Sequence, residues 1–302
     1  MNTGSDREFV ENADRKTAKR FSVRLLPRLI FTAIVIAIIT PLFAAPMILG
    51  SLLPNSAGAT NRMGSWWCWL VYKAMGLTFS IEGTEKIVPG SSYIITPNHQ
   101  GNADILALIT MLPIPFLWVI KKQLLRIPLF GWALGRTGAI SLDRSNPTKA
   151  VNALKGASSK LKGGWSVLIY PEGTRSADPN LQPFKKGAFM LAVQSGIPIL
   201  PVTCNGAFHV LPRKTILFIP GHIKVKIGDP IPTEGLTVDD VPELIQRTRN
   251  QILKNLDPDY NPFDEKWSRL EYARNAVPTV PPGPRTSLES RPPTEEKSEA
   301  LR

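Results

Sequence analysis

Short apolar runs and helix-length apolar repeats alternate through the middle of this 302-residue chain. Six runs have the length and boundaries of buried strands: 78–82, 92–96, 116–120, 138–144, 165–169 and 197–203. Four stretches have the apolar pattern of helices: 105–112, 147–161, 189–194 and 241–256. This alternation predicts one α/β domain over residues 78–256, with a mixed β-sheet flanked by helices.

Residues 223–227 have a different pattern, because apolar residues alternate with Lys224 and Lys226. A period of two places both lysines on one face of a strand. We therefore predict an edge strand with one wet face and with solvated lysines.

The N-terminal part is apolar on all sides rather than on one face. No residue from Leu29 to Asn61 is charged, and residues 29–40 have the composition of a membrane helix. Prolines at 41, 46 and 54 interrupt the run, and a helix ends or kinks at proline. The stretch 64–77 that follows is rich in Trp, which favours the membrane–water boundary. We expect a membrane-embedded helical hairpin over 29–77, as two spans or a half-inserted loop.

The two ends of the chain differ from the rest. Residues 1–28 are polar and basic, so the positive-inside rule places them in the cytosol, and a hairpin returns the α/β domain to the same side. No cleavable signal peptide is evident. Residues 257–302 form a C-terminal extension, and from about 276 its Pro-, Ser- and charge-rich composition predicts disorder.

Charge and composition narrow the class of partner. The formal net charge of +12 suits nucleic acid, an anionic membrane surface or phosphorylated substrates. No aromatic-interleaved basic helix or zinc pattern supports nucleic acid. The two cysteines are too few for a disulfide framework, and the three histidines are too scattered to predict a metal site.

The first candidate for chemistry is the stretch from Thr96 to Asp104, which joins a predicted strand to a predicted helix. Ligands commonly bind at such a sheet edge. If the loop curls back, Asp104 accepts a hydrogen bond from one nitrogen of His99, and the other nitrogen can take a proton from a substrate hydroxyl. The alternative is a histidine at a helix start, with the aspartate favoured by the helix dipole.

The second candidate is Tyr170-Pro-Glu-Gly-Thr-Arg-Ser176, directly after a predicted strand. Proline ends strand pairing, and glycine permits an unusual turn. The guanidinium of Arg175 beside turn amides is suited to bind phosphate oxygens. The alternative is a surface turn with an ion pair between Glu172 and Arg175.

These stretches and two others resemble the four ordered blocks of the glycerolipid acyltransferase family, over residues 60–256. The blocks are Asn98-His99 with Asp104, Gly138 to Arg144, Tyr170 to Ser176, and Ile199 to Thr203. Lys121 stands where the family has a lysine between the first two blocks. Two positions depart from the common pattern of the family. Gly101 stands where the family often has Ser, and Tyr170 stands where it commonly has Phe.

The resemblance implies acyl transfer from a thioester to the sn-2 hydroxyl of 1-acyl-glycerol-3-phosphate, which makes phosphatidic acid. His99 would be the general base and Asp104 would fix its tautomer. The resemblance also implies the substrate-binding residues. Arg144 and Arg175 would bind the phosphate, with Glu172, Gly173 and Thr174 shaping that site; Lys121 would bind phosphate or an oxyanion; Pro201 and Val202 would line a pocket.

The resemblance further implies membrane lipids and lysophosphatidic acid as partners. The acyl donor is acyl-CoA or acyl carrier protein, no cofactor or metal is needed, and the catalytic domain lies on the cytosolic face. Three alternatives remain open. The acceptor could be glycerol-3-phosphate, a lyso-ornithine lipid or another lysophospholipid; the protein could bind lipid without turnover; or it could be a serine hydrolase, for which the sequence offers no nucleophile elbow.

Overall fold

The computed structural model describes residues 25–53, 56–142, 161, 164–213 and 215–264. Within them the predicted mixed sheet is confirmed as one seven-stranded sheet, in the order β1-β7-β6-β2-β5-β3-β4. The strands are β1 (Thr78–Glu82), β2 (Ile94–Pro97), β3 (Phe116–Lys121), β4 (Ile140–Leu142), β5 (Ser166–Leu168), β6 (Ile199–Asn205) and β7 (His222–Ile227). The five strands from β6 to β4 run parallel, whereas β7 is antiparallel to β6 and parallel to β1.

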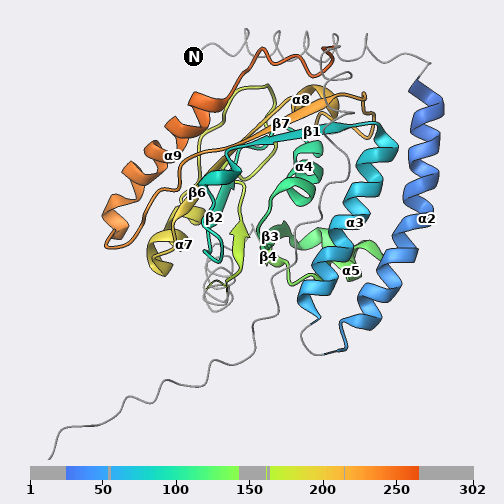
Figure 1. Ribbon diagram of the computed structural model, residues 1–302, viewed down its shortest axis with the longest axis horizontal. Coiled ribbons are helices and arrows are strands. Elements are labelled where there is room, and N and C mark those ends of the chain that lie inside the picture. Colours follow the sequence, from blue (N-terminus) through green and yellow to red (C-terminus); the bar gives the residue numbers. More distant parts are fainter. Residues whose placement is uncertain (1–24, 54–55, 143–160, 162–163, 214, 265–302) are drawn as a thin grey trace, which may run out of the picture.

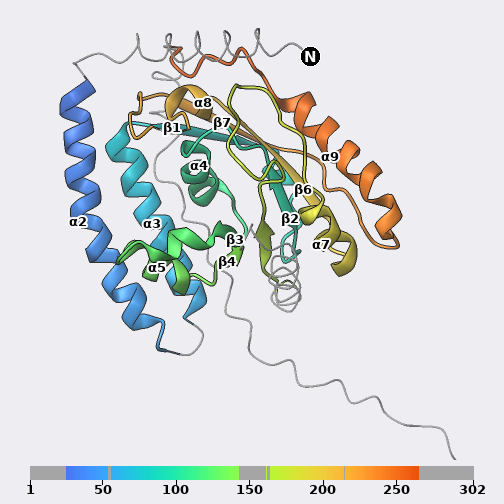
Figure 2. The same ribbon diagram turned by 180° about the vertical axis from the view of Figure 1, so that it is seen from behind.

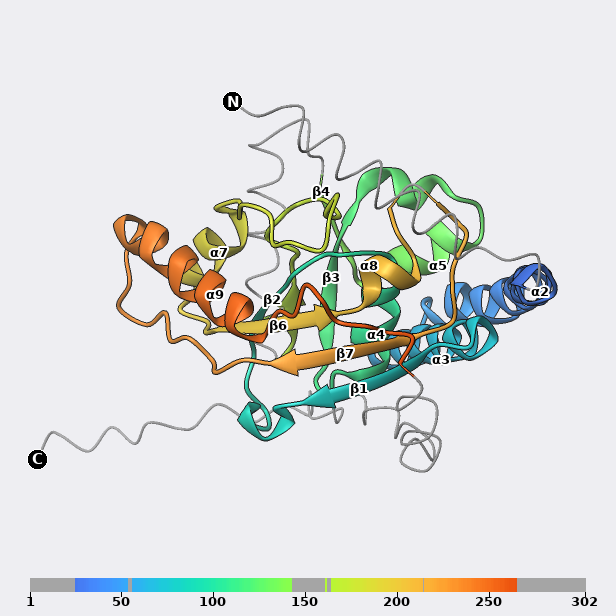
Figure 3. The same cartoon turned by 90° about the horizontal axis from the view of Figure 1, so that it is seen from above.

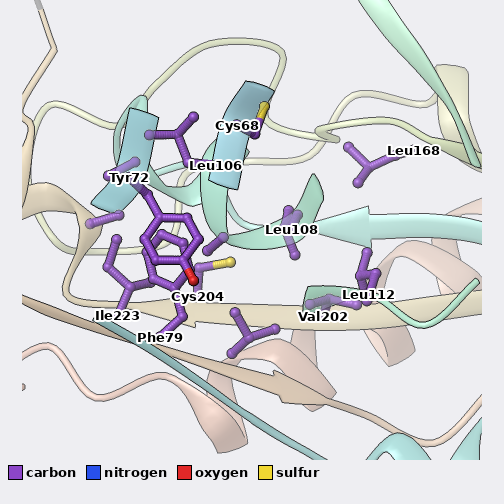
Figure 4. Packing of buried hydrophobic residues seen from close by; sticks show 14 of the residues in the cluster. Cys68, Tyr72, Phe79, Leu106, Leu108, Leu112, Leu168, Val202, Cys204 and Ile223 are labelled. Atoms are coloured by element: carbon purple, nitrogen blue, oxygen red, sulfur yellow. The ribbon is translucent and has the colours of Figure 1, made fainter. Parts of the chain in front are cut away.

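Helices cover both faces of this sheet (Figures 1 and 3). The α-helices are α2 (Leu26–Gly50), α3 (Ala57–Met75), α4 (Ala103–Met111), α5 (Phe130–Arg136), α7 (Gly187–Ser195), α8 (Ala207–Val210) and α9 (Val241–Asn255), and short 3-10 turns are η2 (Thr84–Lys86), η3 (Lys122–Arg126) and η4 (Val238–Asp240). Residues of α3 and α4 pack on one face, around Tyr72, Leu108 and Cys204 (Figure 4). Residues of α7 and α9 pack on the other.

The central strand β2 shows why its sequence is apolar without alternation. Ile94 belongs to the core under α7 and α9, whereas its neighbour Ile95 belongs to the core under α3 and α4, and neither is exposed. A strand covered on both faces must be apolar on both. The predicted helix 147–161 falls almost entirely outside the described residues, as do residues 1–24 and the predicted disordered tail.

The prediction that 223–227 is an edge strand is wrong. β7 lies between β1 and β6, and β1 is the edge strand. The alternation itself is confirmed, because Ile223, Val225 and Ile227 are buried while the two lysines are half-buried. His222 explains part of the pairing: its ring nitrogens lie 2.9 and 2.8 Å from the hydroxyl oxygens of Thr78 and Ser80 on β1. The pattern of polar and apolar residues in a strand indicates which face is exposed to solvent. It does not determine which strands pair with it.

The N-terminal hairpin is present as two helices packed side by side (Figures 1 and 2). The Thr32 hydroxyl donates to the carbonyl of Ala74 over 3.0 Å, and the Trp67 indole donates to the Thr40 hydroxyl over 3.2 Å. The helix does not end at Pro41 or Pro46 as expected, since α2 continues through both, and Pro54 lies outside the described residues. Packing of neighbouring helices and local adjustment of the backbone let a helix in this setting tolerate proline.

Only α2, among the described helices, is long and apolar enough to cross a membrane. Its most apolar window has a mean hydropathy of 2.4, and 17% of that window is buried. Large side chains at every fourth position, Leu26, Ile30, Ile34, Ile38 and Leu42, are each about half exposed or more. The second helix, α3, contains Arg62 and Lys73 and does not meet the same criteria. The structure therefore supports one candidate span with a partner helix.

Candidate active site

The parallel strands bring the predicted blocks to one edge of the sheet. β2 ends two residues before His99, β5 ends four residues before Glu172, and β3 ends at Lys121. Because these strands run parallel and are neighbours, their carboxyl ends lie at the same edge, where ligands bind in open α/β sheets. Blocks that lie far apart in the sequence therefore meet in space.

The loop after β2 curls back as the spacing suggested. Nδ1 of His99 lies 3.1 Å from Oδ2 of Asp104, which is the second residue of α4 and is fully buried. The backbone N–H of Gly101 donates to the same oxygen over 3.0 Å. The His99 side chain keeps 12% of its surface exposed, and Nε2 makes no hydrogen bond to the residues that the structure describes. One nitrogen is thus held by the carboxylate, and the other is available to a substrate.

Tyr170 completes this arrangement and was not among the residues predicted from the sequence. Its ring stacks on the His99 imidazole with 3.7 Å between centroids, and its hydroxyl donates to Oδ1 of Asp104 over 3.1 Å. Burial, and then the nearby Asp104 charge, raise the pKa of Tyr170 well above its usual value. The hydroxyl therefore remains a donor at neutral pH. The replacement of a common Phe by Tyr was the one sequence signal for this contact.

Glu172 ties the histidine loop to the loop that follows β5. Its buried carboxylate accepts the backbone N–H of His99 over 2.7 Å, the Ser176 hydroxyl over 2.7 Å and the backbone N–H of Gln182 over 3.1 Å. The Ser176 N–H in turn donates to the His99 carbonyl over 2.7 Å. Burial raises the pKa of Glu172, and the hydrogen bonds from Ser176, His99 and Gln182 oppose that rise.

Arg175 is held by a residue of the first loop. Its guanidinium donates to Oδ1 of Asn102 over 2.9 Å. The alternative ion pair with Glu172 is absent, because that carboxylate is occupied by the donors of the two loops. A second cation lies nearby, since Arg213 donates to the Arg175 carbonyl over 3.3 Å. Arg175 is half-buried, which leaves part of the guanidinium accessible.

The turn between Glu172 and Arg175 needs a glycine. Gly173 has φ +72°, a conformation that other residues rarely adopt. The Lys185 side chain crosses over it, so a β-carbon there would meet the chain of Lys185 at 3.0 Å. Thr174 is exposed at the tip of the turn.

For the remaining predicted site residues that it describes, the structure gives a position but no contact that assigns a role. Lys121 is exposed at the carboxyl end of β3, at the same sheet edge. Pro201 and Val202 are buried in β6, and Val202 belongs to the core around α3 and α4. Their role in lining a pocket stays a prediction. Arg144 lies outside the described residues.

Asn98 was predicted only as part of the first block, but its side chain has a structural role of its own. Its side chain accepts the Cys204 N–H over 2.7 Å and donates to the Cys204 carbonyl over 3.0 Å. These buried bonds attach the start of the histidine loop to β6. Among the described residues, no group of three or more His, Cys, Asp or Glu side chains could hold a metal ion.

Comparison with known proteins places the chain among acyltransferases. Residues 78–205 match the family model described as Acyltransferase. The chain is 33% identical over 211 residues to the 1-acyl-sn-glycerol-3-phosphate acyltransferase of Pseudomonas aeruginosa, covering 68% of this chain and 80% of that relative. It is 34% identical over 179 residues to the human 1-acyl-sn-glycerol-3-phosphate acyltransferase alpha, covering 59% of this chain and 63% of that relative.

The chain therefore spans a little under two thirds of the length of the human relative. A solved structure is also similar: the crystal structure of the 1-acyl-sn-glycerophosphate acyltransferase PlsC from Thermotoga maritima. The TM-score is 0.65 at 25% sequence identity, and the match covers 78% of this chain and 95% of that one. The fold thus agrees with that of a solved acyltransferase.

Replacement of Glu172 by Gln tests how far the two loops depend on the carboxylate. The amide keeps one oxygen for the His99 N–H, but its NH2 group faces the Gln182 N–H, which is another donor. An unpaired buried donor costs roughly 1–3 kcal/mol. We expect the free energy of unfolding to fall by that amount, measured by chemical denaturation in detergent.

The loss of unfolding free energy in Glu172→Gln should be larger at acidic pH. The native protein holds the Glu172 proton more tightly than the unfolded chain, whose carboxyl has its ordinary pKa of 4.5. The stability from this group is full below that value and is lost as pH rises through the raised native pKa. Gln does not titrate, so the deficit of Glu172→Gln should be largest near the ordinary carboxyl pKa and narrow toward neutral pH. A deficit that grows with pH would contradict the raised pKa.

Gly101→Ser restores the residue common in the family and should destabilise this chain. A β-carbon at Gly101 would lie 2.5 Å from the Leu211 carbonyl oxygen and 2.7 Å from that of Ala207. Overpacking against backbone costs roughly 1–3 kcal/mol. The control is Gly64→Ala, where a β-carbon meets nothing within 4 Å. Thermal unfolding of both variants in detergent decides the matter, and equal stability of the two would refute the close contact.

Proposed function

The chain belongs to the acyltransferase family, and we propose that it transfers a fatty acyl group from a thioester to the sn-2 hydroxyl of 1-acyl-glycerol-3-phosphate. The observation that supports this most directly is the His99–Asp104 contact at the carboxyl edge of the sheet. It leaves Nε2 of a partly exposed imidazole to face a substrate. The product would be phosphatidic acid.

In the proposed reaction, His99 acts as the general base. Nε2 takes the proton of the glycerol 2-hydroxyl while that oxygen attacks the thioester carbonyl carbon. The new C–O ester bond forms, the C–S bond breaks, and the proton passes from His99 to the leaving thiolate. Asp104 holds Nδ1 as a donor, so that the lone pair of Nε2 points outward. The route uses no acyl-enzyme and no cofactor.

The phosphate of the acceptor is assigned to Arg175, whose half-buried guanidinium is oriented by Asn102. A planar guanidinium binds phosphate oxygens in a bidentate way. Gly173 and Thr174 shape this turn, and Glu172 fixes it beside the histidine loop. Lys121 is assigned to the phosphate or to the oxyanion of the tetrahedral intermediate, and Arg144 to the phosphate.

The location that fits this function is a membrane, with α2 embedded and the catalytic domain on the cytosolic face. The acceptor and the product both reside in lipid, and α2 presents a long apolar surface. The acyl donor is acyl-CoA or acyl carrier protein, both acidic and both compatible with the net charge of +12.

The first test measures acyl transfer to lysophosphatidic acid in vesicles, with acyl-CoA and acyl carrier protein donors in parallel. We expect phosphatidic acid from the native chain and a fall of roughly 10²–10⁴-fold for His99→Ala and for Asp104→Asn. The matched control is Asp229→Asn, because the Asp229 side chain is exposed and pairs with Lys86 on the surface. Native-like turnover of His99→Ala would refute the base; no product with any donor would direct the search to glycerol-3-phosphate and other lysolipids.

Tyr170→Phe tests a positioning role. The variant keeps the ring that stacks on His99 and loses the hydroxyl that donates to Asp104. With one donor fewer, Asp104 orients His99 less firmly. We expect kcat to fall about three- to tenfold with KM unchanged. An unchanged kcat with normal stability would show that the hydroxyl does not act through Asp104.

A further inference from the structure

A cluster of exposed apolar side chains lies on η3 and α5, outside the site described above. Its members, here called the η3–α5 patch, are Leu124, Ile127, Leu129 and Trp132. Their exposed fractions are 37%, 44%, 39% and 56%. Four large apolar side chains exposed within nine residues are unusual on a soluble surface, and contiguous patches of this kind mark interaction sites.

The backbone presents these side chains at some cost. Leu129 has φ +60°, and it is the one residue other than glycine with a positive φ in the described part of the chain. Such a conformation is strained for a residue other than glycine and persists where the surroundings impose it. The neighbouring Ala133 is buried against Ala44 and Met47 of α2, so α5 is anchored from behind while Trp132 remains outside.

The patch lies on elements that pack against the N-terminal helices. α5 packs beside α2 and α3 (Figures 1 and 2), and the rings of Phe130 on α5 and Trp67 on α3 are 5.6 Å apart. α5 and α2, which carries the exposed apolar stripe, therefore lie on the same side of the molecule, whereas α9 lies on the opposite side of the sheet (Figure 1).

The charges around the patch indicate which kind of surface it contacts. Exposed cations lie among and beside the apolar residues: Lys121, Lys122, Arg126 and Arg136. The sequence contains no Asp or Glu between Asp104 and Asp143. Apolar side chains mixed with cations, and a tryptophan at the boundary, suit the surface of an anionic bilayer better than an apolar protein interface.

The patch also has a fixed relation to the active site. η3 begins directly after Lys121, the last residue of β3, at the sheet edge where His99 lies. We propose that the η3–α5 patch is a second membrane contact, which rests on the anionic surface of the membrane that holds α2 and brings this sheet edge to the lipid. The contact itself does not depend on the proposed function, whereas its effect on turnover rests on that function.

The test reads the depth of single labels on the full chain. The native cysteines are both buried, and burial raises the pKa of the Cys204 thiol, so an introduced surface cysteine can be labelled selectively. Trp132→Cys and Ile127→Cys receive a polarity-sensitive fluorophore, and the protein is reconstituted in vesicles that contain phosphatidylglycerol and nitroxide-labelled lipid. Ile38→Cys on α2 serves as the embedded reference. Leu253→Cys on α9, 44% exposed, is the matched aqueous control.

We expect blue-shifted emission and strong lipid quenching at positions 127 and 132, weaker quenching in vesicles of phosphatidylcholine alone, and none at position 253. Labels at 127 and 132 that behave like the label at 253 would overturn the proposal. Protection from water that grows with protein density at constant lipid would also overturn it, because a second copy of the chain would then cover the patch.

A turnover measurement adds the functional consequence. The double variant Ile127→Gln with Trp132→Gln should lower acylation of vesicle-borne lysophosphatidic acid about three- to tenfold and leave acylation in detergent micelles unchanged. Val238→Gln, at a residue 55% exposed on η4, is the control. An equal loss in micelles and vesicles would show that the patch supports the fold rather than membrane contact. Absence of turnover by the native chain would count against the proposed function, and the depth of the labels would still decide the proposal.

Discussion

Five neighbouring strands of this sheet run in the same direction, and everything at the candidate site depends on that constraint. Because their carboxyl ends share an edge, the loops after β2, β3 and β5 emerge side by side although the chain between them is long. The first loop contributes His99, the strand between contributes Lys121, and the last contributes Glu172 and Arg175. The helices on both faces make the strands rigid enough to hold the first and last of these loops within hydrogen-bonding distance of each other.

Two buried carboxylates turn this proximity into defined geometry. Burying a charge is costly unless donors surround it. Asp104 is surrounded by His99, the Gly101 N–H and the Tyr170 hydroxyl, and Glu172 by donors from both loops. Each carboxylate therefore fixes the position of the groups that compensate it. Asp104 orients the ring nitrogens of His99, and Glu172 keeps the turn that contains Arg175 against the histidine loop.

The N-terminal helices pack against the α/β domain and are not connected to it by a flexible linker alone. The Arg28 guanidinium lies against Gly76, where a β-carbon would collide with it, and α5 packs on α2. Any movement of α2 in a bilayer would therefore be transmitted to the sheet. For a chain that we propose to act on a lipid, this rigid connection gives the site a set height and orientation relative to the membrane.

The sequence by itself determined the features that depend on near neighbours. Periodicity located the strands and the helices α4, α7 and α9, because burial on one or two faces is reflected in the pattern of successive residues. The spacing of His99 and Asp104 made their contact possible, since both lie within one loop and the first turn of one helix, and the resemblance to the family favoured it over the alternative. The order of blocks was enough to indicate the family.

Tertiary structure decided the features that join distant segments. β7 proved to be interior because β1, about 140 residues earlier in the chain, pairs with its open side. The Tyr170 hydroxyl reaches Asp104 across 66 residues, and Arg175 turns to Asn102 across 73, away from Glu172 three positions before it. α2 runs through Pro41 and Pro46 while it packs against α3 and α5. Such choices depend on which side chains the completed fold places within about 3 Å of one another, and a local pattern contains no record of those distances.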